Sequence, residues 1–299
     1  MDVATTAPCG AELKRMLLSD LASARAELDP MPASRTQAVH RARRRLKRAR
    51  TILRLLRPVA GIDRDHRLEP VRKAFGLLAG ARDADAMLAA GRWLLAHAED
   101  AKDPAFTTLL LNLEQNAHAE HRQSLPLAEI LSLLRIAEAE AASLPEIFDG
   151  MKLFADGLID TYRRGRAGFR KCLDSTAPEV LHDWRKQVKH RLHLTQMVRG
   201  QPGFSVPLLK DLDVLAETLG EAHDFANLDA LVRNDPELAG GRKAATEVRA
   251  RIARRIAKLQ RRAVDLGEEL YGERTRHFVA TVAALPSAPA PQGRDSHAS

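Results

Sequence analysis

VHRARRRLKRARTILRLL, residues 39–56, is the stretch that decides the fold class of this chain. Its apolar residues, Val39, Ala42, Leu46, Ala49, Leu53 and Leu56, recur at steps of three and four. That spacing places them on one stripe of an α-helix, which can pack against neighbouring helices. The cations follow a parallel row beside the stripe. Residues 35–57 hold ten Lys and Arg side chains and no Asp or Glu.

The same pattern returns later in the chain as LHDWRKQVKHRLHLTQMV, residues 181–198. The two stretches align without a gap at a separation of 142 residues, which pairs His40 with His182 and Lys47 with Lys189. A second pair of segments, LLAGARDADAML (77–88) and TLGEAHDFANLD (218–229), pairs Asp83 with Asp224 at a separation of 141. Matches in the same order at a nearly constant offset indicate an internal duplication.

Helical spacing extends through most of the remaining sequence, and β-branched and aromatic residues do not alternate as they do in strands. We therefore expect an all-α protein. The expected helices are 11–28, 35–57, 67–80, 83–98, 104–122, 127–143, 147–173, 178–199, 205–220, 224–233, 237–270 and 272–284. Short connections favour antiparallel packing. This predicts one helical bundle over 1–145, a second over 146–284, and a disordered tail over 285–299.

The composition narrows the class of protein. The 299 residues carry 47 Lys and Arg against 39 Asp and Glu, a formal net charge of +8, which favours a polyanionic partner. Two cysteines, Cys9 and Cys172, are too few for a disulfide framework and lack metal-ligand spacing, so we expect a reducing, cytoplasmic setting. No secretory leader and no membrane-spanning stretch is evident, and we expect no membrane partner.

A run of cations is most often a solvated surface or is neutralised by carboxylates of other helices. Its recurrence in the second copy, and its place beside the apolar stripe, favour a ligand site here. Arg163 and Arg166, just before the second basic helix, are further candidates. The segment 242–262, with nine basic residues against Glu247, is a weaker one.

The two basic helices and the segments around Asp83 and Asp224 resemble the motifs of the CHAD family, the conserved histidine α-helical domains. The resemblance covers about residues 11–284. It implies two four-helix bundles related by a pseudo-twofold axis, with basic helices facing a positively charged central cavity or pore. It also implies binding of inorganic polyphosphate and association with polyphosphate granules. The binding residues that it implies, with the cationic row extended to Arg54, are His40, Arg43, Arg44, Lys47, Arg50, Arg54, His182, Arg185, Lys186 and Lys189.

The second copy departs from the first at two places. Leu192 stands where the first copy has Arg50, and Gln196 stands where it has Arg54. We therefore expect the second wall of the site to bind an anion less strongly.

Polyphosphate has no base or sugar, so it requires a fixed lattice of cations rather than stacking rings. Helix 35–57 contains no aromatic residue, whereas sequence-independent binders of single-stranded nucleic acid usually combine cations with aromatics. Two alternatives stay open: a nucleic-acid-binding protein that uses the same cations at low salt, and an enzyme that processes polyphosphate. No cluster of carboxylates suited to metal-assisted hydrolysis is evident. We therefore predict a binding protein with no catalytic residue, metal or cofactor.

Three further expectations concern individual side chains. Neighbouring cations should disfavour protonation of His40 and His182, and a bound polyanion should favour it, which predicts proton uptake on binding. Asp83 and Asp224 are expected to orient the cations, with a plain surface or helix-capping role as the alternative. A metal site at Asp63, Asp65 and His66 is a weak alternative to helix capping.

Overall fold

The computed structural model describes residues 10–32, 34–56, 64–98, 103–145, 150–175, 177–200 and 203–285. Throughout these residues the regular structure is helical, which confirms the all-α prediction. The elements are α1 (Gly10–Ala26), α2 (Arg35–Leu55), α3 (Arg64–Leu77), α4 (Gly80–Ala96), α5 (Pro104–Arg122), α6 (Leu127–Ala142), α7 (Gly150–Asp174), α8 (Pro178–Met197), α9 (Val206–Asn234), the 3₁₀ turn η1 (Pro236–Ala239), α10 (Arg242–Tyr271) and α11 (Thr275–Ala283).

One predicted helix break is wrong. The ranges 205–220 and 224–233 form a single helix, α9, which runs through Gly220 without interruption. Glycine lowers helix stability by roughly 1 kcal/mol relative to alanine. The buried stripe of α9 continues past Gly220 with Ala222, Phe225 and Leu228, and this packing outweighs the cost.

The expected helix 237–270 begins later than predicted. Pro236–Ala239 forms a 3₁₀ turn, and α10 starts only at Arg242. Between them Gly240 and Gly241 adopt φ angles of 88° and 108°, a region that only glycine enters at little cost. The two glycines therefore set the start of α10.

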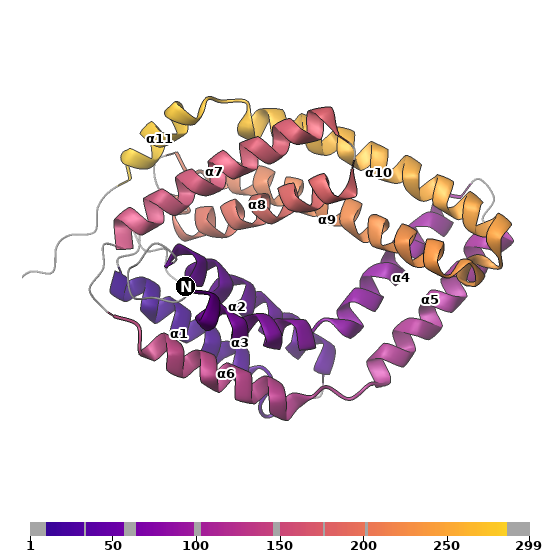
Figure 1. Ribbon diagram of the computed structural model, residues 1–299, viewed down its shortest axis with the longest axis horizontal. Coiled ribbons are helices and arrows are strands. Elements are labelled where there is room, and N and C mark those ends of the chain that lie inside the picture. Colours follow the sequence, from indigo (N-terminus) through magenta and orange to yellow (C-terminus); the bar gives the residue numbers. More distant parts are fainter. Residues whose placement is uncertain are drawn as a thin grey trace, which may run out of the picture.

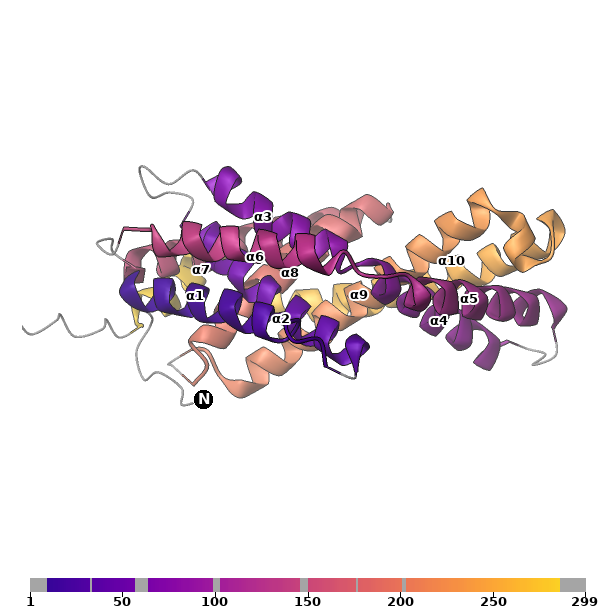
Figure 2. The ribbon, with the colours of Figure 1, turned by 90° about the horizontal axis from the view of Figure 1, so that it is seen from below.

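The helices close into three rings of four. In the first, α1 and α3 each contact α2 and α6. In the second, α8 and α10 each contact α7 and α9. In the third, α4 and α10 each contact α5 and α9. Figure 1 shows the first two rings on the left, one below the other, and the third on the right. Figure 2 shows that the third ring continues the long axis of the molecule.

The third ring joins the two halves of the chain. Its core combines Leu94 of α4 and Leu109 of α5 with Phe225 of α9 and Ile252 of α10. The α4–α5 pair, from residues 80–122, thus packs on helices that follow residue 146. The cores therefore do not follow the division into 1–145 and 146–284, and the duplication stays a prediction from the sequence alignment.

Two expectations fall at or beyond the limits of the described residues. Of the predicted tail 285–299, Leu285 is buried in the core, and 286–299 lie outside the described residues, as does Cys9. Within the described ranges no helix has both the length and the apolar character needed to cross a bilayer.

The second ring is organised around Trp184 of α8, which has no solvent exposure. Gly168 of α7 and Gly267 of α10 let those helices approach the indole. A Cβ added at Gly168 would lie 2.7 Å from Trp184 Cδ1, and one added at Gly267 would lie 2.8 Å from its Cη2. Both distances are too short for real carbon atoms, so these glycines set the spacing of α7, α8 and α10.

We predict that Gly168→Ala lowers the free energy of unfolding by about 1–3 kcal/mol, because the added methyl group overpacks the indole. Chemical denaturation measures the change. Gly76→Ala is the matched control, because nothing lies within 4 Å of a Cβ added there. It should leave stability unchanged or raise it by up to about 1 kcal/mol through helix propensity. Equal effects of the two substitutions would contradict this account of the packing.

Candidate anion-binding site

A cavity of about 720 Å³ lies where α2, α8, α9 and the junction of α3 with α4 meet; we call it the basic cavity. Among the described residues, seven Lys and Arg side chains line it, against three carboxylates. The cations are Arg43, Lys47, Arg50, Arg54, Arg185, Lys186 and Lys189, and the carboxylates are Asp83, Glu120 and Asp224. The basic rows of the two repeated helices thus contribute to one hollow.

Burial of the apolar stripes of α2 and α8 fixes the orientation of both helices and so directs these cations toward the cavity. On α2, Ala42, Leu46 and Ala49 are buried in the core. On α8, Trp184, Val188 and Leu192 are buried in the same way. Because the cations lie beside each stripe rather than opposite it, all of them except the exposed Lys186 are only partly exposed. They line the space between the two helices. Contacts between α2 and α8 keep the two rows close.

Arg43 is held by the end of another helix. Its Nη1 donates to the carbonyl oxygens of Phe75 at 3.0 Å and Leu78 at 2.8 Å, at the C-terminus of α3. A cation is favoured there by the helix dipole. The guanidinium groups of Arg43 and Arg50 also lie 4.1 Å and 5.0 Å from the centre of the Phe75 ring. These contacts fix two arginines of the cavity before any ligand arrives.

Arg54 links α2 to α8 through His190. Its Nη1 lies 3.1 Å from His190 Nδ1. Arginine can only donate, so Nδ1 accepts and carries no proton. Burial, with a smaller contribution from Arg54, lowers the pKa of His190 to about 3. His190 is therefore a neutral acceptor that holds a guanidinium in place.

The cavity lowers the pKa of two of its own lysines, Lys47 and Lys189. Burial, with smaller contributions from neighbouring cations, lowers the pKa of each ammonium group to about 8. Arg185 of α8 contributes to the shift at Lys47, and Lys47 contributes to the shift at Lys189. The two rows therefore repel each other across the cavity.

Two arginines of the cavity also have unused donors. The Nε atoms of Arg50 and Arg185 are buried and have no hydrogen-bond partner among the described residues. A buried donor without a partner costs about 1–3 kcal/mol. Because these Nε atoms are closed to solvent, a ligand with acceptor oxygens would remove that cost only if the two side chains turned toward it.

The two predicted orienting carboxylates line the cavity as well. Burial lowers the pKa of Arg43 and of Arg185, and Asp83 opposes the shift at Arg43 while Asp224 opposes it at Arg185. Burial raises the pKa of Asp224 itself, and Arg185 opposes that shift. Each carboxylate thus acts on the arginine of its own half of the chain.

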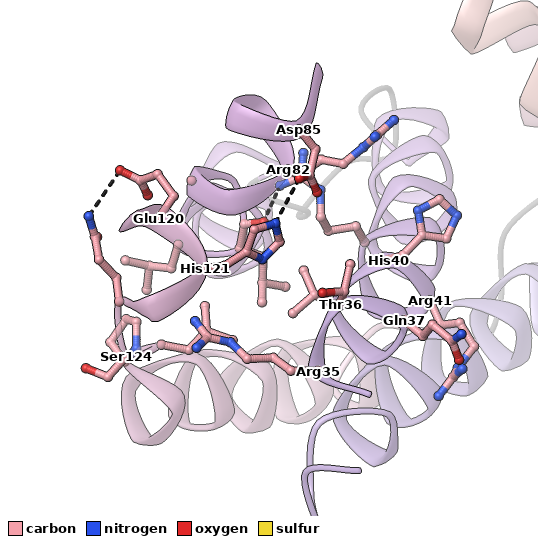
Figure 3. Close-up of a pocket in the computed structure, with 18 residues that line it drawn as sticks. Arg35, Thr36, Gln37, His40, Arg41, Arg82, Asp85, Glu120, His121 and Ser124 are labelled. Atoms are coloured by element: carbon pink, nitrogen blue, oxygen red, sulfur yellow. Dashed lines mark hydrogen bonds and ion pairs between the residues drawn. The ribbon is translucent and has the colours of Figure 1, made fainter. Parts of the chain in front are cut away.

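The two predicted histidines border smaller pockets beside the basic cavity. His40 lines a pocket of about 420 Å³ next to the hydrogen bond between His121 Nε2 and Asp85 Oδ1, at 2.8 Å (Figure 3). This pocket shares Arg43, Gly80 and Glu120 with the cavity. Burial lowers the pKa of His40, and the cations Arg82, Arg44, Lys47 and Arg43 add to the shift.

His182 takes the corresponding place on the other side. Its ring lies 4.5 Å from that of His223, and its Nδ1 is buried without a partner among the described residues. Burial lowers the pKa of His182. His182 and His223 both line a pocket of about 450 Å³, and His223 also lines the basic cavity.

Three histidines that were not among the predicted binding residues line the basic cavity instead: His190, His193 and His223. Burial lowers the pKa of His193 and of His223 to about 4. His193 was within reach of sequence reasoning, because it continues the row of Lys186 and Lys189 on α8. His223 was not, since its place depends on the packing of α9 against α8.

Other candidates lie apart from the cavity. Arg44 is exposed and is absent from the lining. Arg163 and Arg166 line a separate hollow beside α11. In the segment 242–262, Arg249 pairs with Asp229 at 2.8 Å, and Arg255 pairs with Glu221.

The weak metal alternative receives no support from the described part of the chain. It holds no group of three side chains able to bind a metal ion. Asp63 and the side chain of Asp65 lie outside the described residues, and His66 lies 3.5 Å from Glu140.

In a comparison with known protein families, residues 15–233 match the CHAD domain. The chain belongs to the CHAD family. It is similar to the crystal structure of the CHAD domain from the plant Ricinus communis, with a TM-score of 0.62 and 16% identity over 96% of each chain. That likeness supports the fold alone. No curated protein matches the chain.

We predict that this CHAD protein loses stability as the pH falls from 7 to 5. Unfolded histidine binds a proton near pH 6.5, whereas His193 and His223 do so only near pH 4 when folded, so acid favours the unfolded chain. His193→Gln should reduce the loss by about 2 kcal/mol. Urea denaturation at the two pH values measures it. If the wild type and the His193→Gln variant lose the same stability between pH 7 and pH 5, the folded protein does not lower the pKa of His193.

Proposed function

We propose that the protein binds inorganic polyphosphate in the basic cavity without altering it chemically, and that it associates with polyphosphate granules in the cytoplasm. The observation that carries the proposal is the meeting of the two basic rows in one half-enclosed hollow with a surplus of cations. Membership of the CHAD family agrees with it.

The chemistry of the lining fits a chain of phosphates. Arginine guanidinium groups offer paired donors to phosphate oxygens, and lysines add point charges. Arg50 and Arg185 both line the cavity, and their buried Nε donors have no partner among the described residues. A polymer of oxyanions would also bring negative charge between rows that otherwise repel each other.

Nucleic acid fits the same cavity less well. Phe75 is the one Phe, Tyr or Trp among the described residues of its lining. Its ring is already in contact with the guanidinium groups of Arg43 and Arg50. Binders of single strands usually offer free rings for stacking. We therefore favour a polyanion without bases.

The first test replaces the two central lysines. Lys47→Met with Lys189→Met should weaken polyphosphate binding by at least about 100-fold, since each charge-assisted contact contributes about 1.5–3 kcal/mol. Because these ammonium groups are half-buried and repel their neighbours, the variant should fold as well as the wild type. The matched control, Arg135→Met with Lys210→Met, removes two exposed cations. Calorimetry at fixed salt, and then across a salt series, measures both variants.

Competition and incubation decide between the alternatives. Polyphosphate should displace a labelled DNA duplex, and the duplex should fail to displace polyphosphate at the same salt. The opposite order would favour nucleic acid as the partner. Shortening of long chains on incubation with Mg²⁺ or Mn²⁺ would overturn the non-catalytic proposal.

The second test follows protons. At pH 8 Lys47 and Lys189 are partly deprotonated, and a bound polyanion raises their pKa, so binding should take up protons. Affinity should therefore fall as the pH rises from 7 to 9. Calorimetry in buffers of different ionisation enthalpy counts the protons. The uptake should vanish in the Lys47→Met, Lys189→Met variant and persist in the Arg135→Met, Lys210→Met control; uptake that persists in both would assign it to other groups.

A further inference from the structure

Arg163 and Arg166, which lie apart from the basic cavity, belong to a second hollow of about 760 Å³. We call it the α7–α11 hollow. Its described lining is Arg163, Arg166, Ala167 and Arg170 from α7, with Thr275, Arg276 and Val279 from α11. Four arginines thus meet in one concave surface. Arg276 was not predicted from the sequence, because only the docking of α11 on α7 brings it there.

No carboxylate stands among the residues that the structure describes in this lining. The contrast with the adjacent face of the same helix is direct: Arg164 pairs with Asp160 at 2.9 Å. The carboxylate nearest in sequence to α11, that of Glu273, lies 3.3 Å from His277. Arginines three and seven residues apart on α7 share one face, where like charges destabilise a helix. The positive charge of the hollow is therefore left for an anion.

The hollow is held in shape by buried neighbours. Arg166 Nε donates to the carbonyl oxygen of Tyr271 at 3.0 Å, at the end of α10. The hydroxyl of Tyr162 donates to the carbonyl oxygen of Glu273 at 2.8 Å, which fastens the connection from α10 to α11. The ring of Phe278 on α11 stacks on Tyr162 with centres 4.1 Å apart. Thr275 and Arg276, at the N-terminus of α11, are thereby fixed against α7.

Helix α7 separates this hollow from α8, whose basic row lines the cavity (Figure 1). The two sites therefore lie on different sides of the second ring. A short anion can occupy only one of them at a time, whereas a long flexible polymer can reach both. Two linked contacts of this kind raise the overall affinity through effective concentration.

We propose that the α7–α11 hollow is a second polyphosphate site, which holds another segment of the polymer bound in the basic cavity. This inference rests on the proposed function. The lining has no aromatic side chain for base stacking and only two small apolar residues, Ala167 and Val279, among those described. Guanidinium groups that face an acceptor-rich polymer suit phosphate oxygens, and the positive end of the helix dipole at the α11 N-terminus adds to the attraction.

The test compares a short probe with a long one. Arg163→Gln with Arg170→Gln removes two exposed cations of the hollow and leaves Arg166 in its structural contact. The control, Arg135→Gln with Lys210→Gln, makes the same change in net charge elsewhere. Calorimetry measures the binding of tripolyphosphate and of long-chain polyphosphate. We expect the hollow variant to bind the long chain at least about tenfold more weakly than the control, and tripolyphosphate in the cavity equally well.

Other outcomes separate the two proposals. If the hollow variant binds long chains like the control while Lys47→Met, Lys189→Met loses them, the second site is wrong and the cavity stands. If the hollow variant loses affinity for tripolyphosphate and for long-chain polyphosphate to the same extent, the proposal that the hollow is a site separate from the cavity is wrong. If the wild type binds neither probe, both proposals are wrong. The assignment of the hollow to polyphosphate would also be wrong if the hollow variant bound duplex DNA more weakly than the control but bound polyphosphate equally well.

Discussion

The repulsion between the basic rows of α2 and α8 is the constraint on which the site depends. Cations with so few carboxylates would separate if they were free to move. They stay together because each row lies beside an apolar stripe whose burial fixes its helix. Hydrophobic packing thus holds the charges in an arrangement that electrostatics alone opposes, and the lowered pKa values of Lys47 and Lys189 are the sign of that opposition.

The third ring gives the arrangement its rigidity. Because α4 and α5 pack on α9 and α10, the first half of the chain cannot move away from the second without exposing the core around Leu94, Leu109 and Phe225. The same helices bring Asp83 and Asp224 to the cavity, one from α4 and one from α9. A pair of bundles in side-by-side contact alone would leave the width of the cavity less well defined. Interlocking the halves is how this fold sets the distance between two repelling surfaces.

The sequence predicted the helices well, since amphipathic spacing is a local property and survives into the fold. It predicted all seven Lys and Arg side chains of the described cavity lining for the same reason. Arg43, Lys47 and Arg50, for example, lie on one face of one helix. The sequence did not predict the position of side chains that depends on how other helices pack around them. Arg44 belongs to the same run but faces solvent, and Arg163 and Arg166 look toward α11 rather than α8. The predicted break between residues 220 and 224 is absent, because the buried stripe of α9 continues through Phe225. No local pattern could show that His223 would meet His182.

The division of labour among the cations follows from their surroundings. Arg43 and Arg50 share the Phe75 ring, and Arg54 is held by His190, so these guanidinium groups keep fixed positions and full charge. The central lysines can lose a proton instead, and the three cavity histidines are already neutral. The empty cavity can therefore lower its own charge, which limits the repulsion that the fold must resist. A polyanion reverses that adjustment, and the site then reaches its full positive charge only when it is occupied.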